Sequence, residues 1–454
     1  MSTNAYTLLI VESPTIASIV QKRSPSSVYV LSTDGFCWRP GYDSENDRLK
    51  AVANPEKRPI RKELKEQSAA ASQIIIATDA DPSGDFIAWS LHRFIQRPNI
   101  RIGRLKGLNR NGIQAMLEQA DQINPHELEI RLKNRFLLHR EWSKHAAVPD
   151  IQLAALTAIF GTETNFNHFL DENDQIFRST KPFRCPADEW ITIRKYREGN
   201  VYRVDKPLST FDLIESIVRN DLARSYLEAQ KNLNNLFQSV LPSSGEALIS
   251  YPRTDARAFY SDTWEHLERE YLKRGEYSDL KPAYLRDIAD TNIPHESVHP
   301  LSLFLKPDEV HGEHSKSLSV LYKLIYDQTL RAIRMPRPVD EAYVSELSPD
   351  TQYFPDQPGE PTNVNSLRPC LTLGDIGHRM SELGALRASR FGRDSDRWVD
   401  NGWIEIRNDV VTPGPKVLKN LKHANLLSRV LGEVGEKLDQ GALQPETVRA
   451  IISS

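Results

Sequence analysis

Acidic side chains follow two short apolar stretches of this sequence, in a pattern that suits a metal ion. Glu12 directly follows the first stretch, and Asp79, Asp81 and Asp85 follow the second. Where parallel strands end at one edge of a sheet, crowded carboxylates repel one another unless a hard cation takes their oxygens. Such a cation can hold and polarise a phosphate group. The pattern therefore predicts a Mg²⁺ site of Glu12, Asp79 and Asp81, with Asp85 as an optional fourth ligand.

The acidic run around Asp79 also has a simpler interpretation. Asp and Gly are favoured in turns, so a D-x-D-x-x-G sequence on its own is typical of a plain loop. The second acidic strand end, at Glu12, is the observation that favours the metal site over the turn.

A tyrosine and an arginine stand two residues apart, at Tyr251 and Arg253. A phenol is a poor nucleophile at its usual pKa of about 10. A nearby cation assists it by stabilising the charge that builds up as its oxygen attacks phosphorus, and a guanidinium matches phosphate geometry. The pair therefore fits attack on a phosphodiester. On its own, however, it is more typical of a half-buried strand tyrosine with Arg253 on the same face.

A histidine, His295, follows later in the chain within the run Pro294–Pro300. An imidazole can donate a hydrogen bond to a phosphate oxygen or move a proton near neutral pH. The alternative is an ordinary surface histidine. Taken on its own, the residue is more typical of such a surface histidine.

Two groups of basic residues favour binding of a nucleic-acid backbone. Contacts of lysine and arginine with phosphates are independent of base sequence and sensitive to salt. Each group taken singly fits a solvated helix face equally well. The groups are Arg131, Lys133, Arg135, Arg140 and Lys144, and then Arg379, Arg387, Arg390, Arg393 and Arg397.

Short apolar runs alternate with helix-like stretches in the first part of the chain. Strands are expected at 7–11, 28–31 and 74–77, and helices at 14–20, 60–71 and 86–94. Strands separated by helices predict a parallel α/β sheet with helices on its faces. The two acidic segments would then lie at one edge of that sheet.

Helical spacing dominates the remainder, with short strand-like segments between. Helices are expected over 125–160, 206–235 and 315–335, strands near 185–205 and 403–411, and a proline-rich connector over 351–369. The expected fold class is therefore α/β plus α.

Composition excludes some classes of protein. The net charge of −3 decides nothing about nucleic acid, because basic patches can lie within an acidic total. No apolar run of about 18 residues occurs, so no membrane span is expected. The first residues lack a basic signal-peptide region, and the cytoplasm is the expected location. Cys37, Cys185 and Cys370 form no C-x-x-C pair, so neither a zinc ribbon nor a disulfide framework is expected.

The same residues resemble a known family, the type IA DNA topoisomerases. Leu9–Pro14, Ala77–Asp81 and Ile87–Trp89 are similar to the V-E-S-P-x-K and A-T-D-x-D-R-E-G-E-x-I-A-W motifs of its Toprim domain. Leu248–Asp255 is similar to the I-(S/T)-Y-x-R-T-D motif around its nucleophilic tyrosine, and Pro294–Pro300 to A-H-E-A-I-R-P. Toprim domains also occur in primases and some nucleases, so the tyrosine motif is what points to a topoisomerase.

The resemblance implies a toroid-like architecture in which a Toprim domain is followed by helical domains and a reduced β arch. The implied segments are a Toprim metal-binding domain (1–125), the first part of a helical DNA-binding body (126–184), the first part of the arch (185–205), a helical domain with the catalytic tyrosine (206–343), the second part of the arch or a linker (344–370), and the second part of the body (371–454).

The resemblance also implies the reaction. Tyr251 attacks a DNA phosphodiester and leaves a 5′-phosphotyrosine, Arg253 and His295 stabilise the phosphate, and Glu12 protonates the departing oxygen. Mg²⁺ is the implied cofactor, resealing needs no ATP, and the implied partner is single-stranded or negatively supercoiled DNA. Further DNA contacts are implied for Arg135, Gln152, Lys206, Thr254 and Asp255.

Several positions depart from the family's motifs. Ile16 replaces a lysine, Pro82 and Ser83 replace Arg-Glu, Asp150 replaces a basic residue and His299 replaces an arginine. The segments expected to form the arch are short, and no zinc or basic tail is expected after them. These differences question strand passage more than DNA cleavage.

Three alternatives stay open. The first is a degenerate topoisomerase that binds or nicks single-stranded DNA without passing strands. The second is a Toprim nuclease or primase, which would not need the motif around Tyr251. The third is a DNA-binding scaffold without catalytic activity.

Overall fold

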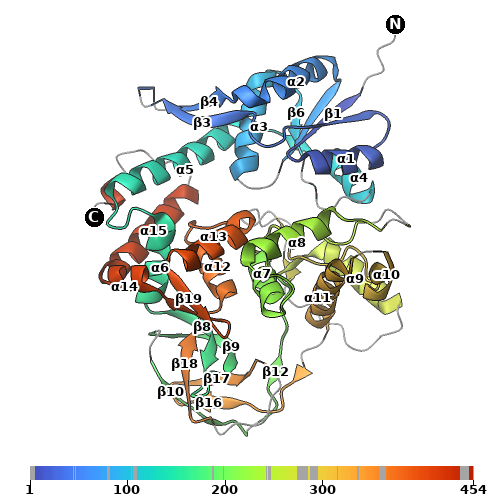
Figure 1. The fold of residues 1–454 in the computed structure, drawn as a ribbon. Helices are drawn as coiled ribbons and strands as arrows, with labels where there is room; N and C mark the ends of the chain where they lie inside the picture. Colours follow the sequence, from blue (N-terminus) through green and yellow to red (C-terminus); the bar gives the residue numbers. More distant parts are fainter. Residues whose placement is uncertain are drawn as a thin grey trace. The chain divides into compact units, whose positions relative to one another are not determined.

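The computed structural model describes residues 6–452 with internal gaps (Figure 1). Outside the described residues lie 1–5, 44, 47, 79–81, 104, 106–109, 187–188, 198, 242, 244–246, 274–284, 287–294, 314, 335–336, 357–363, 440–448 and 453–454. The chain divides into two units. The first comprises Met1–Glu141, Asn235–Tyr251 and Glu436–Val448, and the second comprises Trp142–Asn234, Pro252–Gly435 and Arg449–Ser454.

A five-stranded sheet in the order β2-β1-β5-β6-β7 forms the centre of the first unit. Its strands are β1 (Thr7–Val11), β2 (Val28–Ser32), β5 (Gln73–Ala77), β6 (Ile100–Ile102) and β7 (Asp121–Gln122). The first four are parallel, and β7 is antiparallel to β6. Helices cover parallel sheets on both faces, which explains why β1 and β5 are nearly continuous apolar runs. The predicted parallel α/β sheet is confirmed.

Helices and one hairpin complete this unit. They are α1 (Pro14–Arg23), α2 (Arg58–Ala70), α3 (Pro82–Ile95), α4 (Arg110–Gln119), α5 (Pro125–His145), which continues into the second unit, the 3₁₀ turn η1 (Pro55–Lys57), and the hairpin of β3 (Trp38–Asp43) and β4 (Arg48–Ala53). Leu64 of α2 and Trp89 of α3 are fully buried in one core with Leu8 and Ile76 of the sheet. The hairpin lies in a stretch, between residues 31 and 60, for which the sequence pattern predicted no strand or helix.

A seven-stranded sheet in the order β10-β18-β8-β9-β17-β16-β11 lies in the second unit. Its strands are β8 (Thr164–Leu170), β9 (Ile176–Cys185), β10 (Ile191–Thr192), β11 (Arg194–Lys195), β16 (Tyr343–Ser345), β17 (Ser348–Pro355) and β18 (Ser366–Cys370). Strands from two distant parts of the chain are therefore interleaved in one sheet. Because β10 and β11 stand at opposite ends of this order with only Ile193 between them, the sheet nearly closes on itself.

This sheet takes in more of the chain than the segments expected to form the arch. β8 and all of β9 except its last residue precede residue 185, and both ends of the expected connector at 351–369 are strands. Phe169 packs edge-on against Tyr353 and Phe177 packs edge-on against Tyr343, and all four side chains are buried. This packing depends on pairing between distant segments, so local periodicity did not indicate it.

Helices make up most of the remaining second unit. They are α6 (Ile151–Gly161), α7 (Thr210–Arg219), α8 (Tyr226–Gln238), α9 (Ser261–Lys273), α10 (Pro307–Glu313), α11 (Lys316–Ile333), α12 (Leu373–Glu382), α13 (Phe391–Asp400), α14 (Pro415–Asn420) and α15 (Ala424–Asp439), with the 3₁₀ turns η2 (Ala388–Arg390) and η3 (Leu421–His423). The short strand pairs are β12 (Tyr202–Arg203) with β15 (Arg337–Pro338), β13 (Phe259–Tyr260) with β14 (Leu285–Arg286), and β19 (Ile404–Arg407) with β20 (Val410–Pro413). The expected α/β plus α fold class is confirmed.

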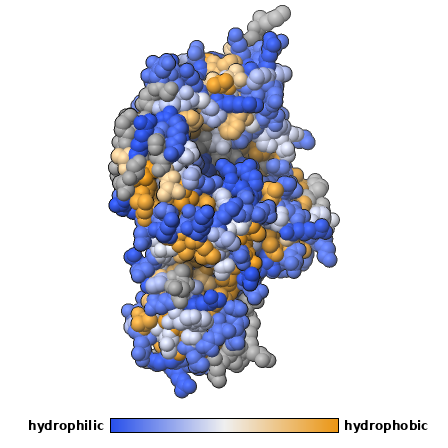
Figure 2. All heavy atoms as spheres, turned by 60° about the vertical axis from the view of Figure 1, so that its left-hand side comes forward, coloured by the Kyte–Doolittle hydropathy of each residue, from blue (hydrophilic) through white to orange (hydrophobic). Residues whose placement is uncertain are grey.

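In the described part of the chain, the helices give no sign of a membrane-spanning segment. None of the helices in the described ranges is both long and apolar enough to cross a bilayer. The face drawn in Figure 2 is largely hydrophilic, with smaller hydrophobic areas between. Cys37, Cys185 and Cys370 are buried free thiols, and burial raises the pKa of the first two to about 11.

Candidate active site

Glu12 follows β1 at the sheet edge where β5 also ends. The parallel register pairs Val11 with Ala77, so the chain leaves both strands at the same edge. The carbonyl oxygen of Glu12 accepts hydrogen bonds from the hydroxyl of Ser32 (3.0 Å) and the N–H of Gly35 (3.3 Å). Gly35 has φ +81°, a conformation that glycine adopts readily. The predicted meeting of two strand ends is therefore confirmed.

The other expected metal ligands differ in what surrounds them. Asp79 and Asp81 lie outside the described residues. Asp85 stands in the first turn of α3, where negative charge is favourable, and its carboxylate lies 3.4 Å from the guanidinium of Arg131. Within the described ranges, no group of three or more His, Cys, Asp or Glu side chains is spaced to hold a metal ion. Asp85 thus has a protein partner, and a metal ion would compete with Arg131 for it.

Tyr251 ends the segment Asn235–Tyr251, which belongs to the same unit as Glu12. Its side chain is 8% exposed, and its ring packs edge-on against Phe237 with centroids 5.6 Å apart. An isolated bridge between Val240 and Ala247 closes the loop that precedes it. The tyrosine ring is therefore held by packing within the first unit.

Hydrogen bonds tie the residues after the tyrosine to two other motifs. The buried hydroxyl of Thr254 donates to the carbonyl oxygen of His295 (3.0 Å) and accepts from the N–H of Ala256 (3.0 Å). At the start of α7, the hydroxyl of Thr210 donates to the carbonyl oxygen of Pro252 (2.6 Å) and accepts the N–H of Thr254 (2.7 Å). Three segments that are distant in sequence therefore meet at Thr254.

The residue after His295 has a structural role that the sequence reasoning missed. The Glu296 carboxylate accepts the N–H of Tyr260 (2.9 Å) and the hydroxyl of Thr263 (2.9 Å). Both donors lie where α9 begins, and the backbone N–H of Tyr260 is one that a helix leaves without an internal partner at its N-terminus. Backbone pairing of Val298 with Leu208 continues the same junction.

The expected catalytic residue Arg253 and two of the expected DNA contacts, Arg135 and Asp255, have separate surroundings. Arg253 is half-buried in the second unit, and Arg135 is half-buried on α5. The Asp255 carboxylate accepts a hydrogen bond from the hydroxyl of Ser381 on α12 (2.9 Å). Asp255 is therefore engaged with the protein, whereas sequence reasoning assigned it to DNA.

Gln152 is buried, and its amide is fully used inside the second unit. Nε2 donates to Asp394 (2.9 Å) and to the carbonyl oxygen of Ala385 (3.3 Å). Oε1 accepts from the indole N–H of Trp398 (3.0 Å) and from Arg397. A side-chain amide offers two donors and one oxygen with two lone pairs. These four bonds therefore give Gln152 a structural role and leave no capacity for DNA in this conformation.

Asp150 has a local reason for its place before Gln152. Its carboxylate accepts the N–H groups of Gln152 (2.9 Å) and Leu153 (3.2 Å) as the N-cap of α6. Aspartate is among the preferred residues there. A basic residue at this position would lose the cap.

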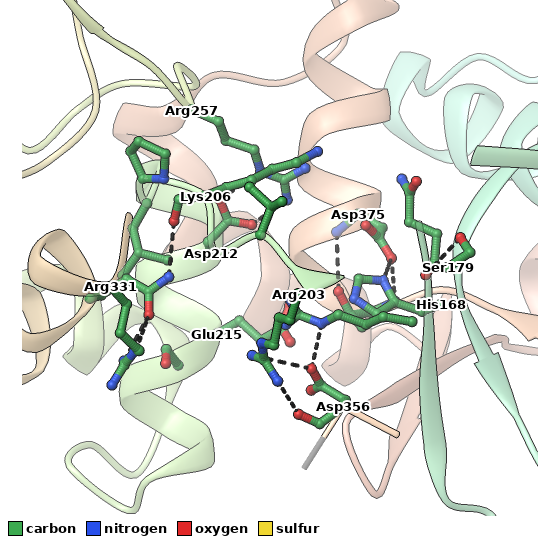
Figure 3. Close-up of a pocket in the computed structure, with 18 of the residues that line it drawn as sticks. His168, Ser179, Arg203, Lys206, Asp212, Glu215, Arg257, Arg331, Asp356 and Asp375 are labelled. Atoms are coloured by element: carbon green, nitrogen blue, oxygen red, sulfur yellow. Dashed lines mark hydrogen bonds and ion pairs between the residues drawn. The ribbon is translucent and has the colours of Figure 1, made fainter. Parts of the chain in front are cut away.

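Lys206 lines a polar cavity of about 620 Å³ in the second unit (Figure 3). Side chains from β8, β9, β12, α7, α11 and α12 contribute to its walls. The charged and aromatic lining residues are Arg178, Arg203, Lys206, Arg219, Arg257, Arg331, Asp212, Glu215, Asp356, Asp375, His168, Tyr202 and Phe354. Apart from Lys206 and the helix signal around Asp212, sequence reasoning did not single them out, because they come from distant segments.

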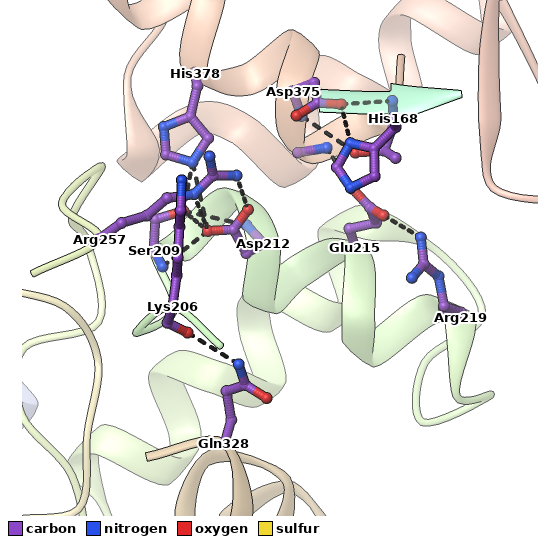
Figure 4. A network of polar contacts seen from close by, with 12 residues as sticks. His168, Lys206, Ser209, Asp212, Glu215, Arg219, Arg257, Gln328, Asp375 and His378 are labelled. Carbon is purple, nitrogen blue, oxygen red and sulfur yellow. Dashed lines mark hydrogen bonds and ion pairs between the residues drawn. The ribbon is translucent and has the colours of Figure 1, made fainter. Parts of the chain in front are cut away.

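Buried carboxylates at the starts of α7 and α12 organise one side of this cavity (Figure 4). Asp212 accepts hydrogen bonds from the Ser209 hydroxyl (2.7 Å) and Arg257 Nε (2.8 Å). Burial would raise the pKa of Asp212, but Arg257 and then His378 hold that pKa well below its ordinary value. Asp212 therefore carries a negative charge balanced by a fixed cation.

The second helix start repeats this arrangement with different partners. Asp375 belongs to a capping box with Thr372 and lies 2.7 Å from Nδ1 of His168. Burial would raise the pKa of Asp375, but His168 and Arg257 lower it below its ordinary value. Burial instead raises the pKa of Glu215, although Arg219 opposes that shift.

Comparison with known proteins gives three findings. A family model described as the Toprim domain matches residues 7–106. The chain is 24% identical over 373 residues to the protein named DNA topoisomerase 1 of Aquifex aeolicus (strain VF5), covering 72% of this chain and 66% of that protein. It thus spans just under two thirds of that relative's length. The structure of full-length topoisomerase I from Thermotoga maritima has a similar fold, with a TM-score of 0.66 at 15% identity, covering 98% of this chain and 88% of that chain.

Proposed function

We propose that this chain, a type IA topoisomerase-like protein with a Toprim domain, is a DNA topoisomerase that cuts one DNA strand, passes another and reseals the cut. The observation that carries the proposal is that Tyr251 and Glu12 belong to one unit although they are distant in sequence. The hydrogen bond between Thr254 and His295 supports it, because it joins the tyrosine motif to the histidine motif.

In the proposed reaction, the Tyr251 hydroxyl gives up its proton to solvent and its oxygen forms a bond with phosphorus, while the bond from phosphorus to the 3′ oxygen breaks. Glu12 gives a proton to the departing oxygen and takes it back on resealing. Arg253 and His295 bind the phosphate and stabilise its charge. The 5′-phosphotyrosine link keeps the energy of the phosphodiester, so resealing needs no nucleotide.

Glu12, Asp79 and Asp81 are the residues that would hold Mg²⁺, with Asp85 as an optional fourth. Carboxylate oxygens are the donors that this ion prefers, and Glu12 stands at the strand edge where ligands of parallel sheets bind. Bound Mg²⁺ neutralises charge on a phosphate. The ion pair between Asp85 and Arg131 makes Asp85 the weakest candidate of the four.

Covalent trapping tests the proposal. The protein is incubated with end-labelled single-stranded DNA and Mg²⁺, denatured, and examined for a protein–DNA adduct. Tyr251→Phe should abolish the adduct and leave DNA binding intact. Tyr29→Phe, which changes an exposed tyrosine of the same unit, is the matched control and should keep it. An adduct that persists in Tyr251→Phe contradicts the tyrosine assignment.

A second assay separates the alternatives. Relaxation of a negatively supercoiled plasmid to closed circles without ATP requires strand passage or rotation while the break is open, followed by resealing. Nicked plasmid alone, formed through Tyr251, would instead indicate a nicking protein. Cleavage that is unaffected by Tyr251→Phe would favour a Toprim nuclease.

A further inference from the structure

The hairpin of β3 and β4 forms a separate two-stranded sheet in the first unit (Figure 1). Among the described strands, β4 pairs with β3 alone, so its other edge is open. Backbone N–H and C=O groups at an open strand edge are templates for pairing with another extended segment. The register of the hairpin determines which of these groups point outward.

Ala51 and Ala53 direct their backbone groups to the open edge of β4. The N–H of Asn54 donates to the carbonyl oxygen of Cys37 (3.0 Å), which makes these two residues a hydrogen-bonded pair of the antiparallel ladder. Such pairs alternate with pairs whose groups point outward, and Ala51 and Ala53 belong to the outward kind. Leu49 has the same orientation but is buried. Ala51 is partly exposed and Ala53 is exposed, so a partner strand can reach both.

The two edges of the hairpin are not equivalent. Pro40 on β3 stands opposite Ala51, and in this outward-facing position it lacks the N–H that a partner strand would need. Proline on an edge strand is a common means of preventing unwanted pairing. β4 contains no proline. The outer edge of β3 is thus blocked at its middle, whereas the edge of β4 is available.

A cavity of about 430 Å³ runs along this open edge. The five consecutive β4 residues 48–52 line it, whereas Trp38 is the one lining residue from β3 among the described residues. The opposite wall is α3, through Ser90, Arg93 and Phe94. The ring centroids of Trp38 and Phe94 lie 4.9 Å apart, which makes part of the lining apolar. A short extended segment therefore fits between β4 and α3.

Cations dominate the rim of this cavity. Arg48 and Lys50 share the Asp43 carboxylate, at 3.5 and 3.0 Å, and their side chains are 58% and 52% exposed, against 8% for Asp43. Arg93 on the opposite wall is also exposed and lies 3.7 Å from Glu129. None of the described lining residues is a carboxylate. Two cations on one covered carboxylate leave a surplus of positive charge, which attracts an acidic ligand and repels a second copy of the same edge.

The two faces of the hairpin indicate the side chains of such a ligand. Successive residues of a strand point to opposite faces. Arg48 and Lys50 project from the exposed face of β4, whereas Leu49 and Ala51 pack into the core of the unit. A strand added to β4 would continue both faces. Its residues beside the two cations would be acidic, and those facing Phe94 would be apolar.

We propose that the open edge of β4 binds an extended peptide of alternating acidic and apolar residues, which adds a third strand to the hairpin against α3. In this mode of recognition, main-chain hydrogen bonds supply affinity and alternate side chains supply specificity. A peptide backbone offers both donors and acceptors to the edge. The phosphates of a nucleic acid suit the cations but offer no donor to the carbonyl oxygens of the edge. This binding does not involve Tyr251 or the proposed reaction.

Fluorescence anisotropy with the full chain tests the charge requirement. The probe is a labelled peptide of about seven residues, a usual strand length, with alternating aspartate and valine. It should bind with a Kd below about 1 mM, and a probe with lysine in place of aspartate should not. Arg48→Glu combined with Lys50→Glu should weaken binding at least about tenfold, because attraction becomes repulsion. Lys65→Glu, on an exposed position of α2 outside the cavity, should have no effect.

Backbone pairing is tested separately. Ala51→Pro removes the outward N–H and should weaken binding by about 2- to 12-fold, the equivalent of one hydrogen bond. Ala51→Gly keeps the N–H and should bind like the parent, and thermal melting checks that each variant is folded. Peptides with N-methyl groups on alternate residues test the same contact without altering the protein. Methylation of one alternate set should abolish binding, and methylation of the other set should preserve it.

Several outcomes would overturn the proposal. These are the absence of binding up to about 1 mM, equal binding of the acidic and basic probes, and equal effects of the two methylated sets. Displacement of the peptide by a thymidine oligonucleotide of equal charge would assign the edge to nucleic acid instead. Dimers of the parent that Ala51→Pro prevents, measured by sedimentation, would assign it to a second copy. Amide hydrogen exchange should show protection of residues 48–53 on peptide binding, and protection confined to other segments would place the peptide elsewhere.

Discussion

The hydroxyl of Thr254 lies 3.0 Å from the carbonyl oxygen of His295 and donates a hydrogen bond to it. The hydroxyl oxygen of Thr254 also accepts a hydrogen bond from the N–H of Ala256, so the hydroxyl both donates and accepts. A threonine three residues after Tyr251 thus fixes the backbone from which the histidine side chain projects. Its role in the motif is to join segments, in addition to any contact with DNA.

Thr254→Val should lower both stability and cleavage. Valine keeps the shape but leaves the carbonyl of His295 and the N–H of Ala256 without this partner, which costs about 1–3 kcal/mol of unfolding free energy. Adduct formation at a temperature where the variant remains folded should fall as well, since His295 loses its anchor. Urea unfolding and covalent trapping measure the two effects. Thr254→Ser keeps the hydroxyl and should resemble the parent; a valine variant of parent stability would contradict this role.

Gln152→Leu should destabilise the second unit without altering the salt dependence of DNA binding. The substitution leaves Asp394 and Trp398 with buried polar atoms that have lost a partner, at about 1–3 kcal/mol for each such group. Gln114→Leu changes an exposed glutamine and should shift stability by less than about 0.5 kcal/mol. A variant of Gln152 that keeps its stability but has a smaller salt slope would instead assign this residue to DNA.

Asp375→Asn should remove part of the acid sensitivity of folding. The lowered pKa of Asp375 means that its contribution is fully present above the ordinary value of 3.8 and is lost as pH falls through the lower value in the folded protein. The variant should therefore be less stable than the parent at pH 7, and the difference in unfolding free energy should begin to shrink below about pH 4. Urea unfolding between pH 3 and 7 measures this. A difference in unfolding free energy between parent and variant that stays constant from pH 3 to 7 would contradict this explanation.

Gly392→Ala should be strongly destabilising, whereas Gly432→Ala should not. A Cβ at Gly392 would lie 2.2 Å from the carbonyl oxygen of Tyr226, a backbone atom at the start of α8. Overpacking of this kind costs about 1–3 kcal/mol. Gly432 lies within α15 with nothing within 4 Å of such a Cβ, so alanine should gain about 0.5–1 kcal/mol from helix propensity. Thermal melting of both variants gives the comparison. A Gly432→Ala variant less stable than the parent would refute the prediction made for that position.

The parts of the first unit that could be predicted from sequence are those in which burial produces a recognisable run of apolar residues. β1 and β5 are buried on both faces, so their uniformly apolar residues identified them, and Glu12 followed as a strand-end residue. Tyr251 was identified by its motif. Its packing against Phe237 had no local signal.

Local sequence patterns did not predict the cavity or the buried hydrogen-bond networks. Arg331, Tyr202 and His168 belong to elements that only tertiary packing brings together. Gln152 was interpreted as a DNA contact because the resemblance supplied a role, whereas its four partners come from a segment more than two hundred positions away in the chain. Single residues acquire such roles from their neighbours in space.

The alternating order of the seven-stranded sheet has a consequence for synthesis of the protein. β8 and β9 leave the ribosome long before β17 and β18, which are their outer neighbours in the finished sheet. Until then the nascent hairpin presents two unsatisfied edges, which are natural templates for pairing with another chain. Folding that depends on such long-range closure is slow. Slowed translation between these segments, or a shortage of chaperones, should therefore favour aggregation through this hairpin.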